Sequence, residues 1–385
     1  MMKICIVTGT RAEYGLLYWT IKKLKSEKFF NVQICVTGMH LSPEFGLTFK
    51  QIEEDGFVID KKVEMLLSSD SATGISKSIG LGIIGFADIF SDLQPDIVLL
   101  LGDRFEIFAA ATAAMIAKIP IAHCHGGEAT EGLIDEPIRH SITKMSHLHF
   151  TSTEEYRKRV IQLGEQPNRV FNVGALGIEN INKLKLLNKS DFEKSIGFKL
   201  LKQTFLITFH PVTLENSTAE DQFVNLLSAI KKYPNTTYIF TMPNADNDGR
   251  VIIKLIQNFV ANNKNTSIAF TSLGQLRYLS AIKHVDLVIG NSSSGLIEAP
   301  SFKKPTINIG DRQRGRVYGL SVINCKPSEK EIIESIKLGL SDSFRKKLNK
   351  SSNPYGNKNA SIEIVKILKK VLVNDNLVKK RFYNL

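Results

Sequence analysis

Ionisable side chains gather at the ends of two apolar runs in the first half of the chain. The run at residues 96–101 leads into Asp103 and Arg104, and the run at residues 119–122 leads into the segment HCHGGE, residues 123–128. If both runs are strands of one parallel sheet, their ends line the same crevice. Carboxylates and imidazoles in such a crevice can move protons, so we look for function there first.

Four side chains in this region suit proton transfer at carbon: Asp103, His125, Glu128 and Asp135. Carboxylates opposite a cationic phosphate site suit the removal of a carbon-bound proton while a phosphate leaves. Asp135 stands four positions before Arg139, so its alternative role is a salt bridge within one helix. The spacing alone leaves both possibilities open.

The sequence predicts neither a metal nor a cofactor. A metal triad of His123, His125 and Glu128 is the alternative to the acid–base interpretation, but no HExxH motif or second cluster accompanies it. Residues 80–85 match GxGxxG, yet no strand precedes them and no acidic residue ends a second strand about 20 residues later. The four cysteines are scattered, and three lie in apolar runs, which favours buried thiols over zinc ligands.

Two turns have the composition of anion-binding sites. The segment TGTRAE at residues 8–13 follows the first strand and opens a helix, so free backbone N–H groups, the helix dipole and Arg11 would meet there. In the second half, VDLVIGN runs into Ser292 and Ser293, whose hydroxyls can bond phosphate oxygens. An ordinary glycine turn and a serine N-cap are the respective alternatives.

Three further residues belong with these turns. Arg312 lies in DRQRGR, residues 311–316, where three guanidiniums so close together are tolerated best beside an anionic ligand. His210 ends the run TFLITFH and so lies at a strand end. Glu298 follows the serines by one helical turn and could accept two ribose hydroxyls, with a solvated helix carboxylate as the alternative.

Strands and helices alternate throughout the chain and must position these residues. Strand-like runs in the first half are KICIVT, VQICVT, DIVLLLG, PIAHCH, HLHFTS and RVFNVG, and those in the second are TFLITFH, TTYIFTM, NTSIAFTS, VDLVIGN, PTINIG and SVINC. The pattern predicts an α/β protein with two doubly wound, Rossmann-like domains facing a central cleft. We expect domains at residues 1–178 and 179–360, with residues 361–385 forming a C-terminal helix and basic tail that packs back on the first domain.

Charge and hydropathy limit the partners. The net charge is +12, but the segment from residue 344 onwards holds 11 Lys and Arg against two acidic residues, and the remainder is nearly neutral. A solvated basic helix face explains this better than nucleic acid. No signal peptide is visible, and no apolar run approaches the roughly 20 residues that span a bilayer. We therefore expect a cytoplasmic protein without nucleic acid or stable membrane association.

The motifs GTRAE, LLLGDRFE, HCHGGE, IDEPIRHSITKMSHLHFTSTEE, HPVT, GNSSSGLIE and NIGDRQRGR occur in this order. From about residue 3 to residue 360 the chain thereby resembles the hydrolysing UDP-N-acetylglucosamine 2-epimerases of bacterial sialic acid biosynthesis. The resemblance implies a glycosyltransferase-B-type fold, UDP held mainly by the second domain, and a homodimer or homotetramer. It also implies conversion of UDP-N-acetylglucosamine and water into N-acetylmannosamine and UDP, through anti elimination to 2-acetamidoglucal and then hydration.

The same resemblance implies roles for single residues. Asp103, Arg104, Glu128 and Asp135 would lie around the sugar. Many relatives have a catalytic glutamate where this chain has His125, so either His125 is the base or Glu128 or Asp103 replaces it. The residues implied for UDP are Arg11, His210, Asn244, Ser292, Ser293, Glu298 and Arg312. Two alternatives remain: a hydrolysing 2-epimerase of a UDP- or GDP-linked 2,4-diacetamido sugar, and a non-catalytic nucleotide-sugar sensor.

Overall fold

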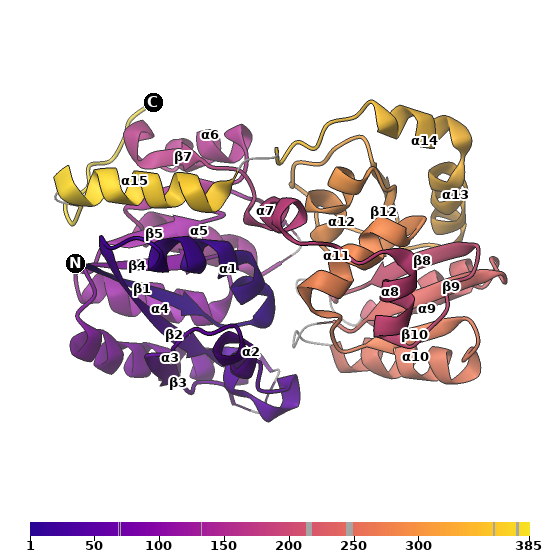
Figure 1. Ribbon diagram of the computed structural model, residues 1–385, viewed down its shortest axis with the longest axis horizontal. Helices are drawn as coiled ribbons and strands as arrows, with labels where there is room; N and C mark the ends of the chain where they lie inside the picture. Colours follow the sequence, from indigo (N-terminus) through magenta and orange to yellow (C-terminus); the bar gives the residue numbers. More distant parts are fainter. Residues whose placement is uncertain are drawn as a thin grey trace. The chain divides into compact units, whose positions relative to one another are not determined.

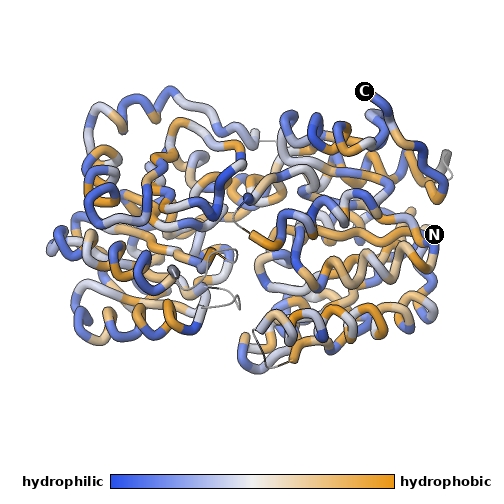
Figure 2. Tube along the Cα trace, turned by 180° about the vertical axis from the view of Figure 1, so that it is seen from behind, coloured by the Kyte–Doolittle hydropathy of each residue, from blue (hydrophilic) through white to orange (hydrophobic). Residues whose placement is uncertain are grey.

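The chain forms two compact units, each built on a parallel sheet (Figure 1). The first unit contains Met1–Glu128, Asp135–Asn180 and Asn357–Leu385, and the second contains Ala129–Ile134 and Ile181–Gly356. The computed structural model describes residues 1–67, 69, 71–131, 133–212, 218–243, 249–356, 359–374 and 377–385. Figure 2 shows that apolar residues concentrate on the strands of both sheets.

The sheet of the first unit has seven strands in the order β3-β2-β1-β4-β5-β6-β7. They are β1 (Met2–Thr8), β2 (Phe30–Thr37), β3 (Lys61–Val63), β4 (Ile97–Leu101), β5 (Ile121–Cys124), β6 (Leu148–Thr151) and β7 (Val170–Asn172). The chain builds outward from β1 on one side and then returns to β4 on the other. In such sheets ligands bind beyond the carboxyl ends of the strands at this switch point, here between β1 and β4.

Helices cover both faces of this sheet. They are α1 (Arg11–Lys25), α2 (Phe49–Glu54), α3 (Ala72–Leu93), α4 (Phe105–Ile116), α5 (Asp135–Met145), α6 (Glu154–Gln162), α7 (Leu176–Lys183) and α15 (Ala360–Asn374). One core cluster joins α1 and α15 to the strands, and another joins α3 and α4 to them. The sheet is therefore buried on both faces, as its continuous apolar strands require.

Helix α3 differs from the sequence-based expectation. It has 22 residues and is apolar enough, by length and composition alone, to cross a membrane, so the expectation that no apolar run approaches this length was wrong. Phe86 and Phe90 are buried, and the helix packs along α4. At Gly82 an added Cβ would lie 2.9 Å from the Cβ of Ala109, which explains the glycine. The GxGxxG pattern thus lies inside a helix and forms no phosphate loop.

The sheet of the second unit has six strands in the order β10-β9-β8-β11-β12-β13, with its switch point between β8 and β11. The strands are β8 (Gln203–Thr208), β9 (Thr236–Thr241), β10 (Ser267–Phe270), β11 (Leu287–Gly290), β12 (Thr306–Ile309) and β13 (Val322–Cys325). The helices are α8 (Lys189–Ile196), α9 (Ala219–Ile230), α10 (Gly249–Asn262), α11 (Gly274–His284), α12 (Ser294–Ile297), α13 (Glu329–Leu340) and α14 (Asp342–Asn349).

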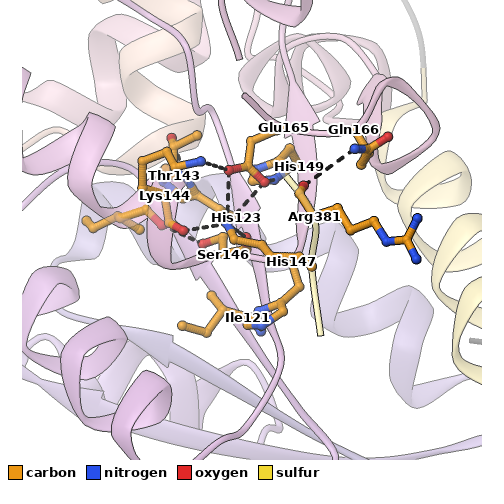
Figure 3. A network of polar contacts seen from close by, with 12 residues as sticks. Ile121, His123, Thr143, Lys144, Ser146, His147, His149, Glu165, Gln166 and Arg381 are labelled. Atoms are coloured by element: carbon orange, nitrogen blue, oxygen red, sulfur yellow. Dashed lines mark hydrogen bonds and ion pairs between the residues drawn. The ribbon is translucent and has the colours of Figure 1, made fainter. Parts of the chain in front are cut away.

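The C-terminal segment is tied to the first unit by a buried ion-pair network (Figure 3). The carboxylate of Glu165 is 3% exposed and lies 2.6 Å from Lys144 Nζ, 3.0 Å from His149 Nε2 and 2.9 Å from Lys380 Nζ. Burial works to raise the pKa of Glu165, but these three partners together lower it to about 2. Lys380 of the basic tail is therefore not simply solvated, because its ammonium group pairs with a buried carboxylate.

Candidate active site

The loop after β4 places Asp103 at the carboxyl edge of the first sheet. Gly102 has a φ of +84°, which turns the chain out of the strand. His123 on β5 supports this turn: its Nε2 lies 2.7 Å from the carbonyl oxygen of Gly102, and its Nδ1 lies 3.2 Å from Thr143 Oγ1. Burial lowers the pKa of His123 to about 3. The ring is thus neutral, donates to Gly102 and accepts from Thr143, and both nitrogens have protein partners.

Arg139 of α5 joins the loops after β4 and β5. Its side chain is 2% exposed and pairs with the Asp103 carboxylate through Nη2. Its Nη1 donates to a Glu136 carboxylate oxygen at 2.9 Å and to the carbonyl oxygen of Glu128 at 2.9 Å. Sequence spacing suggested Arg139 only as a helix partner of Asp135, because contacts between loops cannot be read from i,i+4 spacing. A buried guanidinium with several charge-assisted bonds holds these groups in one geometry.

The segment after β5 buries Glu128 and His125 together. Glu128 is 2% exposed, and its Oε1 lies 2.9 Å from His125 Nδ1 and accepts a hydrogen bond from Ser152 at 2.9 Å. His125 adopts a φ of +65°, and its Nε2 accepts the backbone N–H of Leu176 at 3.3 Å. The structure thus brings Asp103, His125 and Glu128, predicted separately, into one assembly around Arg139.

Arg104 and Asp135 both act electrostatically on the buried acid Glu106. Arg104 precedes α4, and its Nε lies 3.4 Å from Glu106 Oε2. Asp135 is the first residue of α5, where the helix dipole favours a carboxylate. Burial raises the pKa of Glu106, Arg104 lowers it, and the charge of Asp135 raises it further, so the three groups share one electrostatic environment.

Glu13 and Glu106 form a buried acidic pair that the motifs did not reveal. Both side chains flank Gly9, whose N–H donates to Glu13 Oε2 at 2.8 Å. Burial is the main cause that raises the pKa of Glu13 to about 8, and Glu106 is the second. A TxxE capping pattern was the available signal, because Thr10 accepts the Glu13 N–H.

These bonds correct one expectation about the start of α1. The N–H groups of Gly9 and Glu13 are bonded within the loop, so they are not free for an anion. Arg11 is half-buried at the first position of α1 and remains as the cationic group of this turn.

In the second unit, Asn291 joins the turns after β8, β11 and β12. It is 1% exposed, and its side chain bonds both backbone groups of His210: Oδ1 accepts the N–H at 2.7 Å and Nδ2 donates to the carbonyl at 2.8 Å. Its own carbonyl accepts from Arg312 Nη1 at 3.1 Å and Gln313 Nε2 at 2.8 Å. Asn291 was missed because a Gly-Asn pair after a strand also fits an ordinary turn.

Gly290 explains how these turns approach so closely. Its φ is +132°, and an added Cβ would lie 1.9 Å from the carbonyl oxygen of Thr208. Only glycine can stand there.

Tyr278, a half-buried residue of α11, lies close to the serine turn and to Glu298. Burial raises the pKa of Tyr278 on α11, as does the charge of Glu298, whereas hydrogen bonds with Ser292, Ser294 and Thr208 lower it. Ser293 directly precedes α12, and Glu298 directly follows it. Ser292 and Glu298, which belong to one sequence motif, thus share Tyr278 as a neighbour, and no motif pointed to this residue.

The structure leaves one predicted residue undescribed and places one neighbour of Arg312 at the surface. Asn244 lies outside the described residues. In the arginine-rich segment, Arg314 is 66% exposed and pairs with Glu131 at 3.1 Å, so it belongs to the surface.

The chain is similar to known proteins over most of its length. A family model described as UDP-N-acetylglucosamine 2-epimerase matches residues 22–369. The chain is 46% identical over 322 residues to the GDP/UDP-N,N'-diacetylbacillosamine 2-epimerase (hydrolyzing) of Campylobacter jejuni, covering 84% of each protein. It is 45% identical over 386 residues to the polysialic acid biosynthesis protein P7 of Escherichia coli, covering 100% of this chain and 98% of that protein.

Among solved structures, the chain resembles that of UDP-GlcNAc 2-epimerase from Neisseria meningitidis bound to UDP-GlcNAc. The TM-score is 0.81 at 22% identity, with coverage of 96% of this chain and 100% of that one. This likeness confirms the predicted fold class, two doubly wound α/β domains of the glycosyltransferase-B type.

Proposed function

The chain belongs to the UDP-N-acetylglucosamine 2-epimerase family, and on this premise we propose that it is a hydrolysing 2-epimerase that converts UDP-N-acetylglucosamine and water into N-acetylmannosamine and UDP. The observation that carries the proposal is the assembly of Asp103 and Glu128 around the buried Arg139. A protein that only sensed nucleotide sugars would need no such preorganised acids at its switch point.

The proposed reaction has two steps that balance without any redox change. A base removes the proton from carbon 2, the electron pair forms the C1–C2 double bond, and the bond from carbon 1 to the UDP oxygen breaks. Water then adds to the 2-acetamidoglucal: a proton returns to carbon 2 on the opposite ring face, and hydroxide bonds carbon 1. We assign these proton transfers to Asp103, Glu128 and Asp135, because proton transfer by a positioned group typically contributes about 10²–10⁴-fold.

The cationic and neutral donors would stabilise the departing diphosphate. We assign Arg104 to the sugar side and Arg11, His210, Ser292, Ser293 and Arg312 to UDP, with Glu298 accepting ribose hydroxyls and Asn244 also assigned to UDP. Asn291 supports this assignment, because it fixes the backbone of His210 and receives the guanidinium of Arg312. Stabilisation of this kind is effective when the donors are held in place before the charge develops.

The relatives favour two different sugars. The match with the polysialic acid biosynthesis protein P7 extends over the whole chain, which supports N-acetylglucosamine and a role in sialic acid biosynthesis. The similarity to the Campylobacter jejuni enzyme supports a second candidate, a hydrolysing 2-epimerase of a 2,4-diacetamido sugar nucleotide.

Product identity tests the proposal. Purified protein is incubated separately with UDP-N-acetylglucosamine and with UDP- and GDP-linked diacetylbacillosamine, and the products are identified by NMR. The proposal expects N-acetylmannosamine and UDP from the first substrate at a kcat/KM at least about 100-fold above that for the others. The reverse ratio would establish the second candidate, and UDP-N-acetylmannosamine as the stable product would establish a non-hydrolysing epimerase.

Two further properties follow from the proposal. All four cysteines are free thiols, which suits a reducing compartment, and we place the enzyme in the cytoplasm. We also expect a homodimer or homotetramer, which light scattering of the full chain would measure.

A further inference from the structure

We propose that His125 is a positioning residue, which holds the Glu128 carboxylate against the start of α7, and that it is not the base of the reaction. The inference rests on the proposed function, because it takes Glu128 as one of the reacting carboxylates. It differs from the simplest expectation, in which His125 replaces the glutamate that many relatives have at this place.

The hydrogen bonds of the ring determine its protonation state. Nε2 lies 3.3 Å from the backbone nitrogen of Leu176, which can only donate, so Nε2 carries no proton. The ring proton is therefore on Nδ1, which lies 2.9 Å from Glu128 Oε1. A neutral imidazole has one basic lone pair, and the Leu176 N–H occupies it. This leaves His125 without a basic nitrogen to direct at carbon 2 of the sugar.

The backbone holds the ring in this orientation. His125 has a φ of +65°, which is sparsely populated for residues other than glycine and persists only where the surroundings enforce it. Its N–H donates to the carbonyl of Phe150 at 2.8 Å. Gly127, with a φ of +78°, approaches the carbonyl of Tyr156 so closely that an added Cβ would lie 2.5 Å from it. The backbone of the loop after β5 therefore favours this one orientation of the His125 ring.

Contacts with three residues hold Glu128 in position. Ser152 donates to Oε1 at 2.9 Å, and Arg139 bonds the backbone carbonyl at 2.9 Å. His125 supplies the third contact and is the one that connects Glu128 to α7. Two donors on one carboxylate oxygen fix the rotamer, which is how neighbouring groups preorganise a reacting acid or base.

Helix α7 matters for the position of Glu128 because the chain leaves the first unit within this helix. The first unit ends at Asn180, and Leu176 is the first residue of the helix. The N–H groups of a first helical turn have no partner within the helix, and His125 supplies one for Leu176. In the same helix, Glu179 accepts the Ser361 N–H at 2.8 Å and its hydroxyl at 2.5 Å, at the start of α15. His125 thus connects Glu128 to the point where the chain passes out of the unit.

Two substitutions separate positioning from base catalysis. His125→Asn retains a side-chain N–H for Glu128, and asparagine tolerates a positive φ, but its amide cannot act as a base. His125→Ala removes both contacts. The matched control is His147→Asn, because His147 Nδ1 also accepts a backbone N–H, that of Ile121 at 3.1 Å, at the opposite end of β5.

Positioning predicts that His125→Ala lowers kcat by at least about 30-fold with KM changed by less than about 3-fold, whereas His125→Asn stays within about 5-fold of wild type. The pH profile of kcat/KM keeps its shape in His125→Asn. If folded His125→Asn is as inactive as His125→Ala, or loses one limb of the profile, the inference is wrong. It is equally wrong if His125→Ala retains full turnover.

A readout without turnover distinguishes failure of this inference from failure of the proposed function. In protein labelled with ¹⁵N-histidine, NMR identifies the tautomer of each ring, and the signals absent from His125→Asn belong to His125. We expect a neutral ring protonated at Nδ1. Protonation at Nε2, or an imidazolium, overturns the inference even if the enzyme is active. Absence of 2-epimerase activity in wild type overturns the proposed function and, with it, the catalytic part of the inference, while the predicted tautomer remains testable.

Discussion

The two units share one topology at their switch points but use opposite kinds of side chain. At the β1/β4 point of the first unit, charges face one another: Asp103 pairs with Arg139, and Glu13 lies beside Glu106. At the β8/β11 point of the second, the amide of Asn291 bonds backbone groups. The same fold therefore provides a site for moving protons in one unit and a set of fixed donors in the other, because the turn residues decide the chemistry.

The difference also has an electrostatic reason. A proton-transferring carboxylate needs a tuned environment, which burial and a paired guanidinium provide. A diphosphate arrives with its charge, so prepositioned N–H, hydroxyl and guanidinium donors suffice. We therefore expect substitutions in the first unit to reduce turnover and those in the second to reduce nucleotide affinity.

The largest effect is expected for Arg139→Met. Removing the guanidinium takes the buried partner away from the Asp103 carboxylate, while Glu136 keeps His140. We expect this to cost about 3–5 kcal/mol of unfolding free energy and to abolish turnover. Urea denaturation and a turnover assay measure these losses. The control is Arg381→Met, because Arg381 is exposed and substitutions at exposed positions usually cost little. Equal losses of stability and turnover in both variants would show that the buried contacts of Arg139 contribute no more than those of the control arginine.

Asp103→Asn tests the division of roles between the two units and leaves the Arg139 guanidinium in place. The amide cannot exchange a proton at carbon 2, so turnover falls at least about 10²-fold. UDP affinity, measured by calorimetry, stays within about 3-fold, because Asp103 is assigned to the sugar and the UDP contacts, apart from Arg11, are assigned to the second unit. A parallel loss of turnover and UDP affinity would contradict the division of roles between the units.

Asn291→Ala is the reciprocal change in the second unit. It removes the two side-chain bonds to the His210 backbone and keeps the Asn291 carbonyl that accepts from Arg312, so UDP affinity falls about 10-fold or more, since each lost bond costs about 1 kcal/mol. The control is Asn308→Ala, because Asn308 is also buried but donates to Asn324 on β13 at 2.8 Å. If both variants bind UDP equally, Asn291 is only a structural residue.

Glu13→Gln gives the most specific effect, which is on the pH dependence of stability. The pKa of Glu13 is raised from 4.5 to about 8, so between these values the folded state keeps a proton that the unfolded state releases. The unfolding free energy therefore falls as the pH rises from 4.5 through 8, by at most about 1.4 kcal/mol per pH unit. Urea denaturation at pH 5 and pH 8 should show a smaller decrease in Glu13→Gln, and the exposed Glu54→Gln should behave as wild type.

The sequence predicted the elements and the loops better than it predicted the contacts between them. Twelve strand-like runs correspond to strands of the two sheets, whereas β3 was missed because its three residues, KKV, include two lysines and form no apolar run. The segments LLLGDRFE and HCHGGE predicted Asp103 and Glu128 as site residues, because both residues follow an apolar run. Arg139 and Asn291 were overlooked as connecting residues, because each also fits a bland local role, a helix salt bridge or a turn.

The burial of charged residues was the property that the sequence patterns predicted least well. Glu13 and Glu106 look like solvated residues of a first helical turn, yet both are buried beside Gly9. Lys380 lies in a basic run that suggests solvent, but it pairs with the buried Glu165 carboxylate. The burial of Glu13 and Glu106 depends on Gly9, which has no side chain and so leaves room for them. The ion pair of Lys380 depends on a partner that is distant in the sequence.

The most direct test of the central claim follows hydrogen at carbon 2 of the sugar. Wild-type protein is incubated with UDP-N-acetylglucosamine in deuterated water, and the product is examined by ¹H NMR. The account predicts release of UDP and N-acetylmannosamine with one deuterium at carbon 2, because the original proton is lost in the elimination and solvent supplies the new one. N-acetylmannosamine that retains the original hydrogen at carbon 2, or UDP released together with N-acetylglucosamine, would contradict it.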